Sequence, residues 1–128
     1  MLLRARIVVP VSKPPISDGF VRVEGNRITA VGPWAEVETK SEAEDLGEVL
    51  LLPGLVNAHC HLDYTDFVGA IPAPRSFTDW INAIVDLKAD VDNNAHMRSW
   101  MNGANQSLLN GITTVGNIET RLDLLPDL

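Results

Sequence analysis

The sequence is poor in cysteine, in basic residues and in long apolar runs, and each shortage excludes a class of protein. Cys60 is the only cysteine, so no internal disulfide can form and a reducing compartment is suitable. Ten basic against 17 acidic side chains give a net charge of −7 without a basic cluster, which argues against nucleic acid or an anionic membrane surface as partner. No run approaches the ~18 apolar residues of a membrane span. Arg4 and Arg6 also interrupt the amino terminus where a signal peptide would be apolar, so we expect a cytoplasmic protein.

Residues 1–52 show the pattern of a small β-rich domain. The hydrophobic content of 45% is sufficient for a buried core. The stretches "LRARIVV", "GFVRVE" and "RITAV" alternate apolar and polar residues, and Gly25-Asn26 between the last two predicts a tight hairpin. The acidic segment 36–45 has no apolar periodicity and is expected to be a solvated connection before the strand "GEVLLL".

The character of the chain changes at Pro53-Gly54, where we place a domain boundary. "LVNAHC" is typical of a buried parallel strand, and a helix with one buried face is predicted over 76–90, with Ser76 and Asp79 as a capping-box variant. A second helical pattern ends at Gly111 and leads into the β-branched run "ITTVGNI". The order strand, helix pair, strand predicts a parallel βαβ unit.

Two histidines flank Cys60 at the end of the first of these strands. Residues two apart on a strand point to the same side about 7 Å from each other, so His59 and His61 share one face and Cys60 the other. Two imidazoles on one face can converge on one metal ion, but a catalytic zinc usually has three protein ligands, so the pair is a partial site. An isolated pair of this kind can also be two hydrogen-bonded residues at a strand end. Cys60, turned away, is expected to pack.

Two longer motifs resemble a known family. The stretch "LLPGLVNAHCHLDYT" resembles the first barrel strand of the amidohydrolase superfamily, whose members carry a P-G-(apolar)-(apolar)-(N/D)-x-H-x-H signature after a small β domain. The later "LLNGITTVGNI" resembles the second strand of that family. The resemblance covers almost the whole chain, and "NAH-x-HL" is most similar to the branch with chlorohydrolases, guanine and cytosine deaminases, and adenosylhomocysteine or aminofutalosine deaminases.

The resemblance implies an α/β fold in two parts. Residues 1–52 would be part of a composite β-sandwich domain, and residues 53–128 would be the start of a (β/α)₈ TIM barrel, with its first strand, helical crossover and second strand. Because such a barrel needs about 250 residues, we expect the 128-residue chain to be an amino-terminal fragment.

The resemblance also implies the roles of particular residues. His59 and His61 would bind a divalent metal, most often zinc with iron or manganese as alternatives, and the metal would lower the pKa of a bound water. The other ligands and the proton-transferring residues lie on later strands in the family, so no catalytic residue is expected in this chain. Asp63 and Trp80 are the expected substrate-binding residues, with a loop cap and a core position as their alternatives. His96 is interpreted as an ordinary helix residue.

The implied activity is hydrolysis of carbon–nitrogen bonds, namely deamination of a purine-like or other heterocyclic small molecule. The chain alone is expected to be inactive and to need either the missing carboxyl-terminal part of the barrel or self-association. Two alternatives stay open. The chain could be a non-catalytic structural or metal-binding remnant or a split-barrel subunit, or it could come from a cyclic amide hydrolase of the same superfamily. The sequence does not determine the substrate, because specificity depends on loops after later strands.

Overall fold

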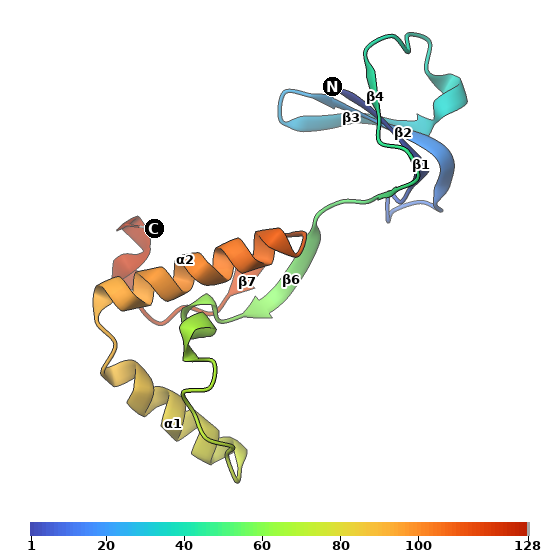
Figure 1. The fold of residues 1–128 in the computed structure, drawn as a ribbon. Coiled ribbons are helices and arrows are strands. Elements are labelled where there is room, and N and C mark those ends of the chain that lie inside the picture. The colour runs from blue at the N-terminus through green and yellow to red at the C-terminus, as the bar shows by residue number, and fades with distance from the viewer. Residues whose placement is uncertain (128) are drawn as a thin grey trace. The chain divides into compact units, whose positions relative to one another are not determined.

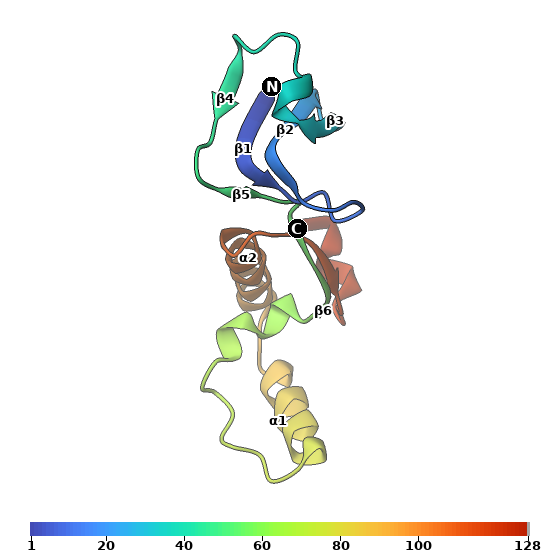
Figure 2. The same cartoon turned by 90° about the vertical axis from the view of Figure 1, so that its right-hand side faces the viewer.

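The computed structural model describes residues 1–127, which fold as two compact units, Met1–Pro53 and Gly54 onward. The elements of the first unit are β1 (Leu2–Val8), β2 (Ile16–Glu24), β3 (Arg27–Pro33), the 3₁₀ helix η1 (Trp34–Glu36), β4 (Ala43–Asp45) and β5 (Leu50–Leu51). Those of the second are β6 (Leu55–Cys60), the 3₁₀ segment η2 (Leu62–Phe67), α1 (Phe77–Ala89), α2 (Asn93–Leu109), β7 (Ile112–Asn117) and η3 (Leu122–Asp127) (Figures 1 and 2). Among these described residues, no helix is long and apolar enough to cross a membrane.

The first unit is a mixed five-stranded sheet with the path β3-β2-β1-β4 and β5 also paired with β1. The predicted hairpin is confirmed, because β2 and β3 pair antiparallel and Gly25 has a φ of +59° in the turn, which glycine adopts without steric cost. Ala5, Val8 and Val21 form the buried core. The sheet thus has a small apolar centre of its own.

The segment 36–45 differs from its prediction as a solvated connection. Its last residues form β4, which pairs in parallel with Leu2–Arg4 of β1, and Arg4 bonds to Asp45 at 3.0 Å. The backbone pairing is long-range, so the local sequence pattern could not predict it. "GEVLLL" forms only the two-residue strand β5, because its neighbour β1 is shared with β4.

The second unit contains the predicted βαβ order. Strands β6 and β7 pair in parallel, and the two helices connect them. Ser76 caps α1 by accepting a hydrogen bond from the Asp79 amide at 3.1 Å. Gly111 follows α2 with a φ of +76°, as expected of a residue just past a helix end.

The prediction that α1 buries one apolar face is confirmed only in part, because the half-buried Trp80 and the buried Ile84 share a face. Ile84 is buried, but Phe77 is 75% exposed and Val85 60% exposed. The apolar stripe is sufficient to form an amphipathic helix, whereas its burial requires a neighbouring element that the described part of the chain does not supply.

Candidate metal and substrate site

The two histidines of the predicted metal site lie at the carboxyl end of β6. Their rings are 5.4 Å apart between centroids and nearly perpendicular, at 73°. His59 is exposed, and its amide donates to Asn57 Oδ1 at 3.2 Å. His61 is half-buried, and its Nδ1 is buried without a hydrogen-bond partner. Two imidazoles therefore lie side by side, and one has a buried ring nitrogen free to act as a ligand.

The ring of His61 is held by the segment that follows it. Tyr64, in η2, stacks on His61 with 4.5 Å between centroids and planes only 8° apart. Tyr64 also stacks on Phe67 at 5.8 Å. The start of η2 is fixed by Asn117 at the end of β7, whose Oδ1 accepts a hydrogen bond from the Leu62 amide at 2.9 Å. Both strands thus position the imidazole.

Cys60, between the two histidines in the sequence, contacts the end of β7. Its thiol is 3.8 Å from Asn117 Oδ1, and burial raises the pKa of the thiol. A cysteine acts as a nucleophile through its thiolate, so this environment disfavours covalent chemistry. The contact supports the packing role predicted from the sequence.

An apolar hollow lies between η2, the loop after it and α1. It is lined by Tyr64, Phe67, Val68, Ile71, Pro74, Trp80 and Ile84. Trp80 is half-buried there and lies 5.7 Å from Phe77 between ring centroids. A substrate contact by Trp80 stays a prediction, but the hollow is bordered by the same Tyr64 that stacks on His61.

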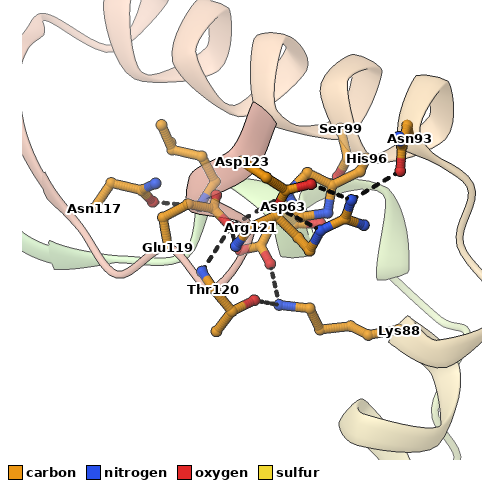
Figure 3. Close-up of polar contacts among 11 residues, drawn as sticks. Asp63, Lys88, Asn93, His96, Ser99, Asn117, Glu119, Thr120, Arg121 and Asp123 are labelled. Atoms are coloured by element: carbon orange, nitrogen blue, oxygen red, sulfur yellow. Dashed lines mark hydrogen bonds and ion pairs between the residues drawn. The ribbon is translucent and has the colours of Figure 1, made fainter. Parts of the chain in front are cut away.

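A cluster of buried polar side chains lies close to η2 and joins four parts of the second unit (Figure 3). We use the name buried cluster for Asp63 in η2, Lys88 in α1, His96 in α2 and Glu119 after β7. Asp63 is fully buried, and its Oδ2 accepts a hydrogen bond from Lys88 Nζ at 2.5 Å. Lys88 Nζ also donates to Thr120 Oγ1 at 2.7 Å. The network therefore ties the end of α1 to both loops that follow the strands.

Glu119 is the second carboxylate of the buried cluster. Its Oε1 accepts hydrogen bonds from the amides of Thr120 and Arg121, both at 2.7 Å. Burial by itself would raise the pKa of this carboxyl, but the two amide donors, with His96 and Lys88 nearby, hold the pKa below its usual value. His96 Nε2 is 3.3 Å from Glu119 Oε1, although the two are not aligned for a hydrogen bond. Glu119 is therefore an anion at neutral pH.

Sequence reasoning did not identify the buried cluster. His96 is only 4% exposed and faces Glu119, so it is not the ordinary helix residue expected from its place in α2. Glu119 follows a β-branched strand, which places it at a parallel-strand carboxyl end, but nothing local indicates which helix residue it meets. Asp63 is buried against Lys88, so a substrate contact by its carboxylate stays a prediction.

Curated proteins resemble the chain over part of their length. No family model matches it. It is 32% identical over 132 aligned residues to an allantoinase of Streptomyces avermitilis, covering 99% of this chain and 25% of that protein. It is 35% identical over 68 residues to a 5-methylthioadenosine/S-adenosylhomocysteine deaminase of Moorella thermoacetica, covering 51% and 16%. The chain thus spans a quarter or less of these two relatives.

Solved structures share the fold. An adenosine deaminase of Xanthomonas campestris with bound zinc is 26% identical with a TM-score of 0.72, over 96% of this chain and 29% of that one. The zinc complex of the atrazine chlorohydrolase TrzN of Arthrobacter aurescens is 25% identical with a TM-score of 0.74, over 89% and 27%. An aminofutalosine deaminase of Helicobacter pylori, at 22% identity and a TM-score of 0.75, supports the fold alone. The motifs, the α/β fold and these relatives together make the chain similar to proteins of the amidohydrolase superfamily.

Proposed function

We propose that this chain is the amino-terminal part of a metal-dependent hydrolase that acts on carbon–nitrogen bonds, and that it deaminates a purine-like heterocycle. In this proposal β6, the helix pair and β7 are the first βαβ portion of a (β/α)₈ barrel, and the first unit is part of a composite β-sandwich. The observation that carries the proposal is the pair His59 and His61 at the carboxyl end of β6, the end at which barrel enzymes gather their chemistry.

The residues fit a divalent metal. His61 Nδ1 is a buried ring nitrogen without a partner, and the neighbouring imidazole of His59 is exposed to an incoming ion. Zinc suits such nitrogen ligands, and the Xanthomonas deaminase and the Arthrobacter chlorohydrolase both contain it. Iron or manganese are the alternatives. A divalent ion held there supplies the Lewis acidity that makes water nucleophilic near neutral pH.

The chain's own residues orient the two histidines and line the apolar hollow beside them. Tyr64 fixes the plane of the His61 ring by stacking, and Asn57 binds the backbone beside His59. The apolar hollow beside Tyr64 has flat aromatic walls, including Trp80, which favour a planar heterocycle. Nitrogen-rich rings are the substrates named for several relatives, among them the methylthioadenosine deaminases. We assign proton transfer to residues on later strands of the barrel, as the resemblance to the amidohydrolase superfamily implies.

A cyclic amide hydrolase is the second candidate, and a specific observation favours it. The alignment with the Streptomyces allantoinase covers nearly the whole chain, whereas that with the Moorella deaminase covers half. The two activities differ in the product, since a deaminase releases ammonia and a cyclic amide hydrolase opens a ring.

We also propose that the chain needs a partner that covers β6 and β7. Within the described residues β6 and β7 pair only with each other, and Leu55 and Val56 on β6 are 50% and 68% exposed. Open strand edges and exposed apolar side chains are unfavourable in water. The remainder of the barrel, or a second copy of the chain, would cover them. The isolated chain is therefore proposed to be inactive.

Zinc binding tests the metal site. Isothermal titration of the wild-type chain is compared with the double variant His59→Ala, His61→Ala, and Asn105→Ala on the exposed side of α2 is the control. We expect the double variant to lose one bound equivalent and the control to lose none. Identical stoichiometry and affinity in all three would contradict the proposal.

Activity distinguishes the candidate reactions. The chain is co-expressed with the carboxyl-terminal part of its parent protein and supplied with zinc, and ammonia release from adenosine-type, guanine and cytosine substrates is measured beside ring opening of allantoin. Ammonia release by the pair but not by the chain alone is expected. Ring opening without ammonia favours the second candidate. No turnover of any substrate by the folded, zinc-loaded pair would favour a non-catalytic protein.

A further inference from the structure

The buried cluster contains three potential ligand atoms that converge on one point. One atom each from Asp63, His96 and Glu119 lies within 4.8 Å of the others. The three residues come from η2, α2 and the segment after β7, so the fold itself brings them together (Figure 3). None of them belongs to the His59 and His61 pair.

Each of these residues has a buried polar atom that nothing in the described part of the chain satisfies. Asp63 Oδ1, His96 Nε2 and Glu119 Oε2 are buried without a hydrogen-bond partner. The side chains of Asp63, His96 and Glu119 are 0%, 5% and 6% exposed. A buried polar atom without a partner is unfavourable, and more so when the group is charged. Three such atoms in one place indicate a shared ligand.

The charge and chemistry of the cluster specify that ligand. Two carboxylates and one lysine ammonium leave a negative balance, because Lys88, which pairs directly with Asp63, supplies only one positive charge. An anion would therefore be repelled. Carboxylate oxygen combined with imidazole nitrogen is a donor set that zinc, manganese and ferrous ions accept.

We propose that Asp63, His96 and Glu119 form a second divalent-cation site, separate from His59 and His61, which binds a zinc-like ion. The three ligand atoms lie within 4.8 Å of one another, so an ion bound to all three would link η2, α2 and the segment after β7. Lys88 remains on Asp63 Oδ2 and leaves Oδ1 for the ion. The ion would thus stabilise the segment that carries Tyr64 behind His61.

The experiment uses the double variant His59→Ala, His61→Ala, so that the result does not depend on the proposed hydrolase site. Zinc binding is measured by calorimetry, and cobalt(II) substitution reports the coordination by its visible absorption. We expect one equivalent of metal to remain in this variant. Adding Glu119→Gln should weaken binding at least tenfold. Adding Asp66→Asn, a more exposed carboxylate in the same segment that bonds only to Asn102, should leave it unchanged.

A second readout covers the case in which Glu119→Gln fails to fold. The ¹⁵N resonances of His96 are followed in the double variant as zinc is added, because a metal-bound ring nitrogen shifts differently from a protonated one. A shift at His96 Nε2 that saturates at one equivalent is expected. No zinc binding by the double variant, or binding that leaves the His96 resonances unmoved, would overturn the proposal.

Discussion

Gly103 in α2 allows the helix to lie directly against the segment that follows the histidines. A Cβ atom at this position would be 2.4 Å from Thr65 Oγ1 and 3.0 Å from the carbonyl oxygen of Leu62. The hydroxyl can rotate, but the carbonyl belongs to the backbone of η2, so Gly103→Ala must move that segment. The change gains about 1 kcal/mol of helix propensity. Overpacking costs about 1–3 kcal/mol, so we expect a net loss of up to about 2 kcal/mol in the free energy of unfolding.

Urea denaturation followed by far-UV circular dichroism measures this loss, and zinc titration measures its effect on the site. Asn105→Ala, on the exposed side of the same helix, is the control and should be neutral or slightly stabilising. In a Thr65→Ala background the cost of Gly103→Ala should shrink, because one of the clashing atoms is gone. A Gly103→Ala chain that is as stable as Asn105→Ala and binds zinc like the wild type would refute this account of the packing.

Three further predictions concern charged and reactive side chains. Lys88→Met leaves the Asp63 carboxylate buried without its cation and should lower the free energy of unfolding by about 3 kcal/mol. Adding Asp63→Asn should recover part of this loss. Urea denaturation that shows no loss for Lys88→Met would contradict the pairing. The folded-state pKa of Glu119 lies below its ordinary value of 4.5, so its contribution to stability is present above that pH and is lost as the pH falls through the folded-state value. Glu119→Gln should therefore flatten the acid limb of a stability–pH profile, and an unchanged limb counts against the role of Glu119. Because burial raises the pKa of Cys60, iodoacetamide should alkylate it more slowly in the native chain than in urea, and equal rates would show that the thiol is not protected.

The sequence predicted those features that depend on neighbours along the chain. The Gly25-Asn26 hairpin, the Ser76 cap of α1 and the glycine after α2 each rest on local backbone geometry, and the structure confirms them. The alternation around Cys60 predicts that the thiol turns away from the histidines, and this stays a prediction. The pairing of β4 with β1 and the meeting of His96 with Glu119 join distant parts of the chain, and no local periodicity encodes them. The exposed apolar residues of α1, such as Phe77 and Val85, show a related limit. An apolar stripe predicts a helix, but it does not predict whether a neighbouring element covers that stripe.

The parallel pairing of β6 with β7 also has a consequence for the order of folding. Residues that meet across this pair, such as Cys60 and Asn117, are 57 positions apart, whereas Arg22 and Thr29 in the β2–β3 hairpin are 7 apart. Closing the longer loop costs about 2 kcal/mol more entropy by the logarithmic dependence on length. We expect the hairpin to be protected early in pulsed hydrogen exchange and the β7 amides late, and simultaneous protection would contradict this order. During that interval β6 displays an unpaired edge, so the step that finally assembles the histidine site is also the one most open to aggregation.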